Sequence, residues 1–159
     1  MKTANDALIA LQAHGKTLAT AESCTGGMVG EWLTAIPGSS KSYLGGVISY
    51  TNGVKNALLG VPADVLEQFG AVSEQTAQAM AQGAIRAIGA DIGASVTGLA
   101  GPDGDGSGKP VGLVFTAISG NGKTVCKEHH FSGDRAQIRA AAAEALLTEI
   151  IEFLGEIKQ

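Results

Sequence analysis

The chain has 159 residues, of which 45% are hydrophobic and 16% charged, and its formal net charge at pH 7 is −4. This length predicts a single domain over residues 1–159, long enough to bury about two-thirds of its unfolded surface. The negative net charge argues against an electrostatic nucleic-acid binder, which needs a clustered basic face. No apolar run reaches the roughly 18 residues of a membrane span, so no membrane partner is expected.

The cysteine content and the N-terminus both favour a cytoplasmic protein. The two cysteines, Cys24 and Cys126, suit a reducing compartment better than a disulfide scaffold. The first residues form an amphipathic segment without the apolar centre of a signal peptide. Because only 4% of the residues are aromatic, the core must consist of Ala, Val, Leu and Ile. The 23 glycines indicate tight turns and close backbone approaches.

Apolar spacing and turn residues predict alternating helices and strands in the first half of the chain. In order, these are a helix over 3–14, a strand over 17–21, a helix over 26–36, a strand over 43–50, a helix over 52–59 ending at Gly60, and a helix opened by Pro62. The strand over 43–50 contains a glycine pair, which indicates a bulge or a close backbone approach.

The second half continues this alternation and adds a hairpin. It is expected to hold a helix over 73–88 capped by Ser73, a strand over 92–97, a glycine-dense loop over 98–109, strands over 111–118 and 124–131 joined by Gly120-Asn121-Gly122, and a helix from Asp134 to about Leu154. This order predicts an α/β fold with three layers, α/β/α. Its mixed sheet would have about five strands, including a C-terminal β-hairpin.

The segment Glu22-Ser23-Cys24-Thr25-Gly26-Gly27 joins a predicted buried strand to a predicted helix. Such a turn directs backbone N–H groups and the positive end of a helix dipole at one place, which suits a phosphate or a developing oxyanion. Ser23 fits two roles equally well here, a helix N-cap and a nucleophile. Cys24 is a second candidate nucleophile, although a small residue packed under the loop is the more common role of such a cysteine.

A serine nucleophile needs a base, and the histidines are poorly placed to supply it. His14 ends the first predicted helix, while His129 and His130 lie within a late strand. Lys55, on the helix after the second strand, is the better candidate if burial or a nearby positive charge keeps its amine neutral. The alternative is an ordinary solvated helix lysine.

Three loops, over 22–27, 50–55 and 97–109, follow strand ends and are expected to converge, because ligands of open α/β sheets bind at the carboxyl ends of strands. The loop over 98–109 can cradle a phosphate through its N–H groups or be a flexible surface loop. It is not a Walker A loop, since Lys109 precedes a proline, and Asp103 with Asp105 lacks the closing glutamate of an EF-hand calcium site. Arg135 can grip a phosphate or be an exposed helix arginine.

Several of these segments together resemble the CinA C-terminal domain family, in order over nearly the whole chain. They are Ala21–Gly27, Pro37-Gly38-Ser39-Ser40, Ser49-Tyr50-Thr51-Asn52, Lys55, Leu59-Gly60-Val61-Pro62, Gly70-Ala71-Val72-Ser73, Ser95–Pro102, Lys109-Pro110-Val111-Gly112 and Gly133-Asp134-Arg135. The glycine-rich loop over 98–109 is more acidic than the family pattern. The resemblance implies a nicotinamide-nucleotide amidase, which hydrolyses nicotinamide mononucleotide to nicotinate mononucleotide and ammonia without metal or cofactor.

The resemblance also implies roles for individual residues. Ser23 would be the nucleophile and Lys55 its base, with Tyr50 and Thr97 in the same catalytic site. Substrate contacts would come from Glu22, Thr25, Gly26, Gly27, Asn52, Gly98, Gly101 and Arg135, with Arg139 as the alternative arginine. Glycine N–H groups near Gly26 or Gly98 would hold the oxyanion, and Glu22 would either face the positive pyridinium ring or be a buried structural acid.

Two other functions remain open from the sequence. The first is a non-catalytic nucleotide-binding or sensor module of the same fold. The second is a DNA-associated role, suggested only by the competence-related name of the family and disfavoured by the acidic composition. The apolar, Ala-rich helices also favour a homodimer or larger assembly.

Overall fold

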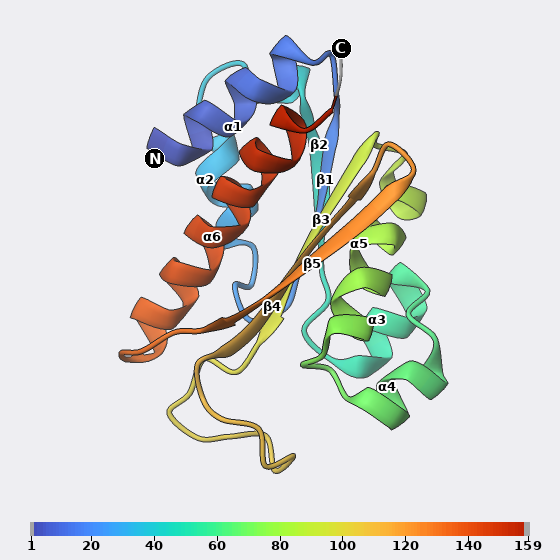
Figure 1. Cartoon of the computed structure of the whole chain (residues 1–159), viewed down its shortest axis with the longest axis vertical. Coiled ribbons are helices and arrows are strands. Elements are labelled where there is room, and N and C mark those ends of the chain that lie inside the picture. Colours follow the sequence, from blue (N-terminus) through green and yellow to red (C-terminus); the bar gives the residue numbers. More distant parts are fainter. Residues whose placement is uncertain (1, 158–159) are drawn as a thin grey trace.

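The computed structural model describes residues 2–157, which form a mixed α/β fold as expected (Figure 1). The elements in chain order are α1 (Lys2–Ala13), β1 (Leu18–Glu22), α2 (Met28–Thr34), the short 3-10 turn η1 (Ser39–Lys41), β2 (Tyr43–Ile48), α3 (Asn52–Leu59), α4 (Ala63–Phe69), α5 (Glu74–Ile88), β3 (Ile92–Gly98), β4 (Leu113–Gly120), β5 (Lys123–His130) and α6 (Arg135–Gly155).

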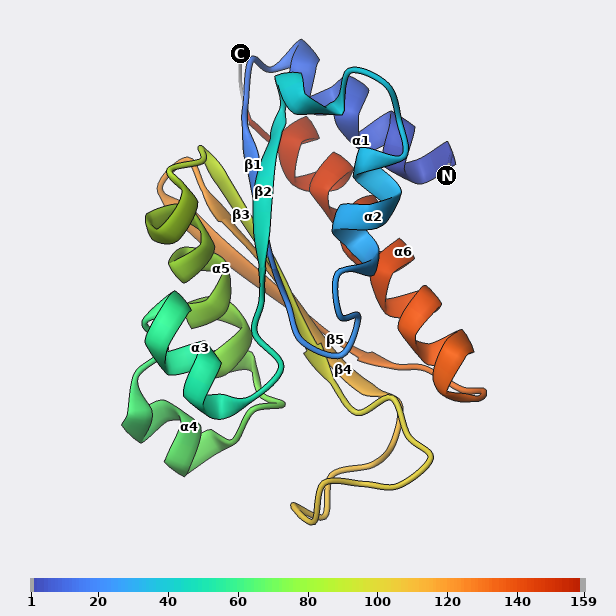
Figure 2. The same cartoon turned by 180° about the vertical axis from the view of Figure 1, so that it is seen from behind.

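The five strands of the described residues form one sheet in the order β2-β1-β3-β4-β5. Strands β2, β1 and β3 are parallel, whereas β4 and β5 run antiparallel and make the predicted C-terminal hairpin. Helices α1, α2 and α6 cover one face of the sheet and α3, α4 and α5 the other (Figures 1 and 2). The three-layer prediction therefore agrees with the structure, and the carboxyl ends of β1, β2 and β3 meet at one edge.

Local sequence signals set most element ends. The Thr51 side chain caps α3 by accepting the Val54 N–H, and Gly60 ends this helix in the left-handed region at φ 65°. A capping box of Asp134 and Gln137 begins α6. The main difference from expectation is α2, which begins at Met28 after Gly27, so Ser23 is not its N-cap.

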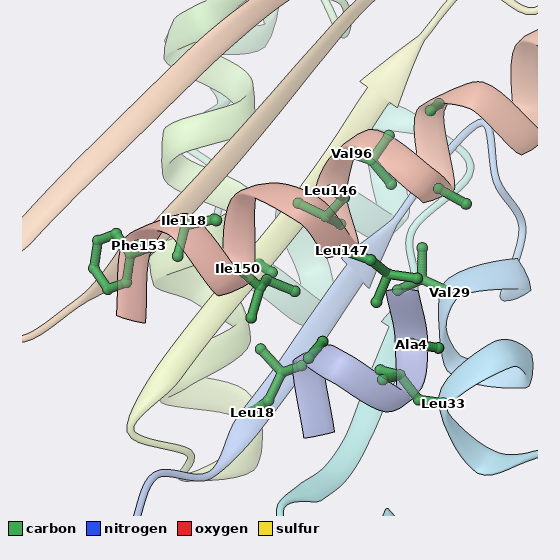
Figure 3. Packing of buried hydrophobic residues seen from close by; sticks show 14 of the residues in the cluster. Ala4, Leu18, Val29, Leu33, Val96, Ile118, Leu146, Leu147, Ile150 and Phe153 are labelled. Carbon is green, nitrogen blue, oxygen red and sulfur yellow. The ribbon is translucent and has the colours of Figure 1, made fainter. Parts of the chain in front are cut away.

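The larger core lies between the sheet and the α1, α2 and α6 layer, where aliphatic side chains such as Leu18, Leu146 and Ile150 interlock (Figure 3). The opposite core, under α3 and α5, is built on alanines of β1 and on Leu59 and Met80. Small residues let these layers approach closely. A Cβ on Gly83 would lie 2.1 Å from the Leu59 carbonyl oxygen, so glycine is required where α5 crosses α3.

Within residues 2–157, no helix has both the length and the hydropathy needed to cross a membrane.

Candidate functional site

The loops after β1, β2 and β3 converge on a cavity of about 310 Å³, at the low end of the usual size range for small-molecule sites. We call it the main cavity. Its lining residues are Ser23, Cys24, Tyr50, Lys55, Ala71, Val72, Thr97, Gly98, Leu99, Ala100, Gly101, Asp103, Gly104, Asp105 and Arg135. The predicted convergence of strand-end loops is thus what the structure shows.

The main cavity contains a serine and a lysine in direct contact. Ser23 directly follows β1, and its N–H donates to the Val96 carbonyl of β3 at 3.0 Å, which extends the sheet ladder by one residue. Lys55 projects from α3 and places its Nζ 2.8 Å from Ser23 Oγ. The same Nζ lies 2.6 Å from the Ser49 carbonyl oxygen, to which it donates. A hydroxyl and an amine are therefore held together at the edge of an open cavity.

Lys55 is fully buried, and no carboxylate forms a salt bridge with it among the described residues. Burial lowers the pKa of Lys55 from 10.5 to about 8, an effect larger than the opposing one of the nearby Cys24 thiol. At pH 7 roughly a tenth of such a lysine is neutral, far more than of a solvated one. The solvated-lysine alternative therefore disagrees with the structure.

Cys24 also lines the main cavity, but its thiol is a poor nucleophile. Burial raises the pKa of Cys24 to about 11, and this outweighs the attraction of the thiolate to Lys55 and Arg139. Very little thiolate exists near neutral pH as a result. Of the two adjacent candidates, Ser23 is the one whose side chain contacts the Lys55 amine.

Glu22 takes the anion position that the strand-to-helix turn was expected to offer a ligand. Its carboxylate accepts the Val29 N–H at 2.9 Å, the Gly30 N–H at 3.1 Å and the Thr25 hydroxyl at 2.7 Å. These contacts place a negative charge at the N-terminus of α2, where it is favourable. Of the two alternatives for Glu22, the structure agrees with the buried structural acid and not with a residue that faces a substrate ring in the main cavity.

Four other residues expected to bind substrate also lie away from the main cavity. Thr25 is fully buried against Glu22, and Asn52 is exposed at the start of α3. Gly26 donates its N–H to the Ser23 carbonyl at 3.1 Å, and Gly27 packs beside Ile48. The turn that holds Thr25, Gly26 and Gly27 closes around Glu22, and none of the four residues lines the cavity.

Of the two candidate arginines, Arg135 lines the main cavity. It donates to the Gly101 carbonyl at 2.6 Å and to the Tyr50 hydroxyl at 3.3 Å, so it links the loops after β2 and β3. Tyr50 itself is 61% exposed. Arg139, one turn later, donates instead to the Cys24 and Thr25 carbonyls at 3.0 and 2.9 Å and holds the backbone of the Ser23 loop.

Part of the cavity wall is formed by Ala71 and Val72, at the turn between α4 and α5. Thr97 lines the cavity and donates its hydroxyl to the Ala71 carbonyl at 2.8 Å. The sequence did not predict that Ala71 and Val72 line the cavity, nor that the Ser49 carbonyl accepts a hydrogen bond from Lys55. Both lie in motifs of the family pattern, Gly70-Ala71-Val72-Ser73 and Ser49-Tyr50-Thr51-Asn52, and that was the available signal.

The histidines lie outside the main cavity, as expected from their positions. His14 contacts the Ala10 carbonyl of its own helix, and His129 and His130 lie on β5. Over residues 2–157, no group of three or more His, Cys, Asp or Glu side chains is arranged to hold a metal ion.

Residues 1–154 match the family model described as the CinA C-terminal domain. Among curated relatives, the chain is 46% identical over 147 residues to a protein of Enterobacter agglomerans named nicotinamide-nucleotide amidohydrolase PncC. That alignment covers 91% of this chain and 90% of the relative. The chain is also 49% identical over 143 residues to a CinA-like protein of Syntrophotalea carbinolica, and this alignment covers 90% of the chain and 35% of the relative.

The chain spans about a third of the length of the first curated relatives it matches, most of which are named competence-damage inducible or CinA-like proteins. Among solved structures, the competence damage-inducible protein A from Klebsiella pneumoniae aligns with a TM-score of 0.96 and 36% identity, covering 99% of this chain and 98% of that one. The competence/damage inducible protein CihA from Agrobacterium tumefaciens aligns with a TM-score of 0.91 and 39% identity, covering 98% and 94%.

Proposed function

Because this chain belongs to the CinA C-terminal domain family, we propose that it is a nicotinamide-nucleotide amidase that uses Ser23 and Lys55. The reaction would convert the carboxamide of nicotinamide mononucleotide to a carboxylate and release ammonia. The observation that carries this proposal is the 2.8 Å contact between a buried lysine, which has no ion-pair partner among residues 2–157, and a serine hydroxyl at the edge of the main cavity. The name of the Enterobacter relative supplies the substrate.

The chemistry follows from the two side chains. Neutral Lys55 keeps one N–H on the Ser49 carbonyl and offers its lone pair to the Ser23 hydroxyl. Ser23 Oγ attacks the carboxamide carbon, and its proton passes through Lys55 to the leaving nitrogen, which departs as ammonia. Water then attacks the resulting ester with Lys55 again as base, which releases the carboxylate and restores the Ser23 hydroxyl.

The pyridinium ring of the substrate assists in two ways. It withdraws electrons from the carboxamide, which makes the carbonyl carbon more electrophilic. Its positive charge also disfavours the ammonium form of Lys55, so substrate binding lowers the pKa of this amine further.

Of the two glycine regions expected to supply the oxyanion donor, the main chain at Gly98 is better placed than Gly26. Gly26 is engaged with the Ser23 carbonyl, and Leu99 donates toward β4, to the Leu113 carbonyl. Because N–H directions alternate along a strand, the Gly98 N–H is directed toward β1, on the side where Ser23 lies. A donor at this place can stabilise the tetrahedral intermediate.

The phosphate of the substrate would bind to Arg135. Two of its five N–H donors are used on Gly101 and Tyr50, which leaves others for an anion in the cavity. This remote contact would orient the carboxamide against Ser23.

Measuring ammonia release from nicotinamide mononucleotide tests the proposal and separates it from a non-catalytic nucleotide-binding module. We expect turnover by the unaltered chain and, in Ser23→Ala, a loss of about 10²–10⁴-fold with binding of the mononucleotides retained. Cys24→Ala is the matched control on the neighbouring side chain and should keep most of the activity. Binding without turnover by the unaltered chain would favour the sensor module, and full activity in Ser23→Ala would contradict the covalent mechanism.

A further inference from the structure

The loop between β3 and β4 projects beyond the end of the sheet and borders the main cavity (Figures 1 and 2). Residues 102–108 are all exposed and include no apolar side chain except Pro102. Hydrophobic burial therefore cannot fix this segment in place, and hydrogen bonds at its two ends must do so.

One attachment is made by Lys109. Its Nζ donates to the Phe69 carbonyl at 2.7 Å and to the Val72 carbonyl at 2.5 Å. Phe69 lies in the last turn of α4, and Val72 lies in the turn before α5 and lines the cavity. Charge-assisted hydrogen bonds of this kind are stronger than neutral ones. Lys109 thereby ties the end of the loop to the cavity wall.

The other attachment is the Arg135 contact to the Gly101 carbonyl. Between the two attachments, Asp103 and Asp105 line the main cavity. The hydroxyl and the main-chain N–H of Ser107 both donate to Asp105, and these contacts hold the pKa of its carboxyl below the usual value. Within residues 2–157, no side-chain donor contacts the Asp103 carboxylate. The loop therefore presents two carboxyl groups at the cavity, and that of Asp103 has no hydrogen-bond partner among residues 2–157.

We propose that Lys109 is a positioning residue, which holds the Asp103–Asp105 segment at the cavity so that its carboxylates accept hydrogen bonds from sugar hydroxyls of the substrate. Carboxylates are common partners of ribose hydroxyls in nucleotide sites, and they repel phosphate, which would bind to Arg135 instead. The sugar part of this inference rests on the proposed amidase function. The positioning part depends only on the contacts of Lys109.

The first test compares Lys109→Met with the unaltered chain in two measurements. Amide hydrogen exchange of residues 102–108, without substrate, should become faster because one attachment is lost. The KM for nicotinamide mononucleotide should rise about tenfold with kcat within about twofold, because sugar contacts are the same before and during the reaction. Lys109→Arg, which keeps donors for both carbonyls, should recover most of the loss. Lys123→Met, at an exposed ion pair with Glu156, is the matched control.

The second test asks whether Lys109 acts through the acidic segment. Asp103→Asn with Asp105→Asn, both at exposed positions that should not affect folding, should raise KM about as much as Lys109→Met does. Adding Lys109→Met to this variant should then change KM little further, because both changes remove one interaction. An additive effect would overturn the proposal, as would an unchanged KM in either variant.

The two proposals fail differently. An unaltered chain that releases no ammonia contradicts the amidase function, whereas unchanged hydrogen exchange in Lys109→Met contradicts the positioning role. If Lys109→Met does not fold, the aspartate variant alone decides the sugar contact, and an unchanged KM there rejects it.

Discussion

Two polar clusters of this protein contain similar groups but have different surroundings. In one, Ser23 contacts Lys55 beside the main cavity. In the other, between β4, β5 and α6, the Glu149 carboxylate contacts the Thr116 hydroxyl at 2.6 Å and His129 Nε2 at 2.9 Å. The second cluster has the hydroxyl, imidazole and carboxylate of a catalytic triad, and only the first adjoins the main cavity.

The second cluster differs from a catalytic triad in the hydrogen-bond partners of its imidazole. In a triad, each imidazole nitrogen has its own partner, one the nucleophile and the other the carboxylate. Here the single His129 Nε2 contacts both Glu149 and Thr116, the latter at 3.0 Å. The three groups are therefore hydrogen-bond partners of one another. A smaller hollow of about 160 Å³ borders Glu149 but not Thr116 or His129. The presence of a hydroxyl, an imidazole and a carboxylate is therefore not enough to make a reactive site. A reactive pair also needs an unfilled position beside it, as Ser23 and Lys55 have.

The largest expected effect comes from Lys55→Met, which removes the base and keeps a long apolar chain in its place. Ammonia release from nicotinamide mononucleotide should fall about 10²–10⁴-fold. Cooperative unfolding should be retained, because a buried amine without a carboxylate partner contributes little to stability. Lys127→Met, at an exposed ion pair with Glu152, is the control and should keep activity within about twofold. Substantial activity in Lys55→Met would contradict the view that the Ser23–Lys55 cluster, unlike the Glu149 cluster, is the reactive one.

The second-largest expected effect is the change of kcat/KM with pH. Because burial places the pKa of Lys55 at about 8, kcat/KM should rise about tenfold per pH unit below that value and level off above it. A profile that is flat between about pH 6 and 8 would contradict Lys55 as the base.

The same group gives a stability measurement that is independent of activity. The folded pKa of about 8 is below the unfolded value of 10.5, so the unfolded chain binds more protons between these values. The free energy of unfolding should therefore increase as pH rises from about 8 to 10.5, and this increase should be absent in Lys55→Met. Urea unfolding of both proteins at several pH values measures the difference.

The smallest effect on activity is expected from Glu149→Gln in the second cluster. The uncharged amide keeps one acceptor but weakens the contacts to Thr116 and His129, so the free energy of unfolding should fall by about 1–3 kcal/mol. Ammonia release, measured on the folded variant, should stay within about twofold. A loss of activity similar to that of Lys55→Met would mean that this cluster takes part in function.

The sequence alone determined the elements and much of the candidate site. Periodicity and caps are local, so Thr51, Gly60 and the turn at Gly120-Asn121-Gly122 specify element ends without any distant contact. The order of strands and helices indicated the three-layer fold. The family motifs singled out Ser23 and Lys55, and local physics explained why a hydroxyl and an amine would be useful there.

Only the tertiary structure decided how these side chains are directed. Ser23 and Lys55 are 32 residues apart, and they meet because β1 and β2 pair in parallel while Gly83 lets α5 pack closely against α3. The path of the turn after β1 directs the Glu22 carboxylate to the N-terminus of α2, and the docking of α6 directs Arg135, not Arg139, to the main cavity. Side-chain direction depends on how separate elements dock, and no local pattern of residues records that.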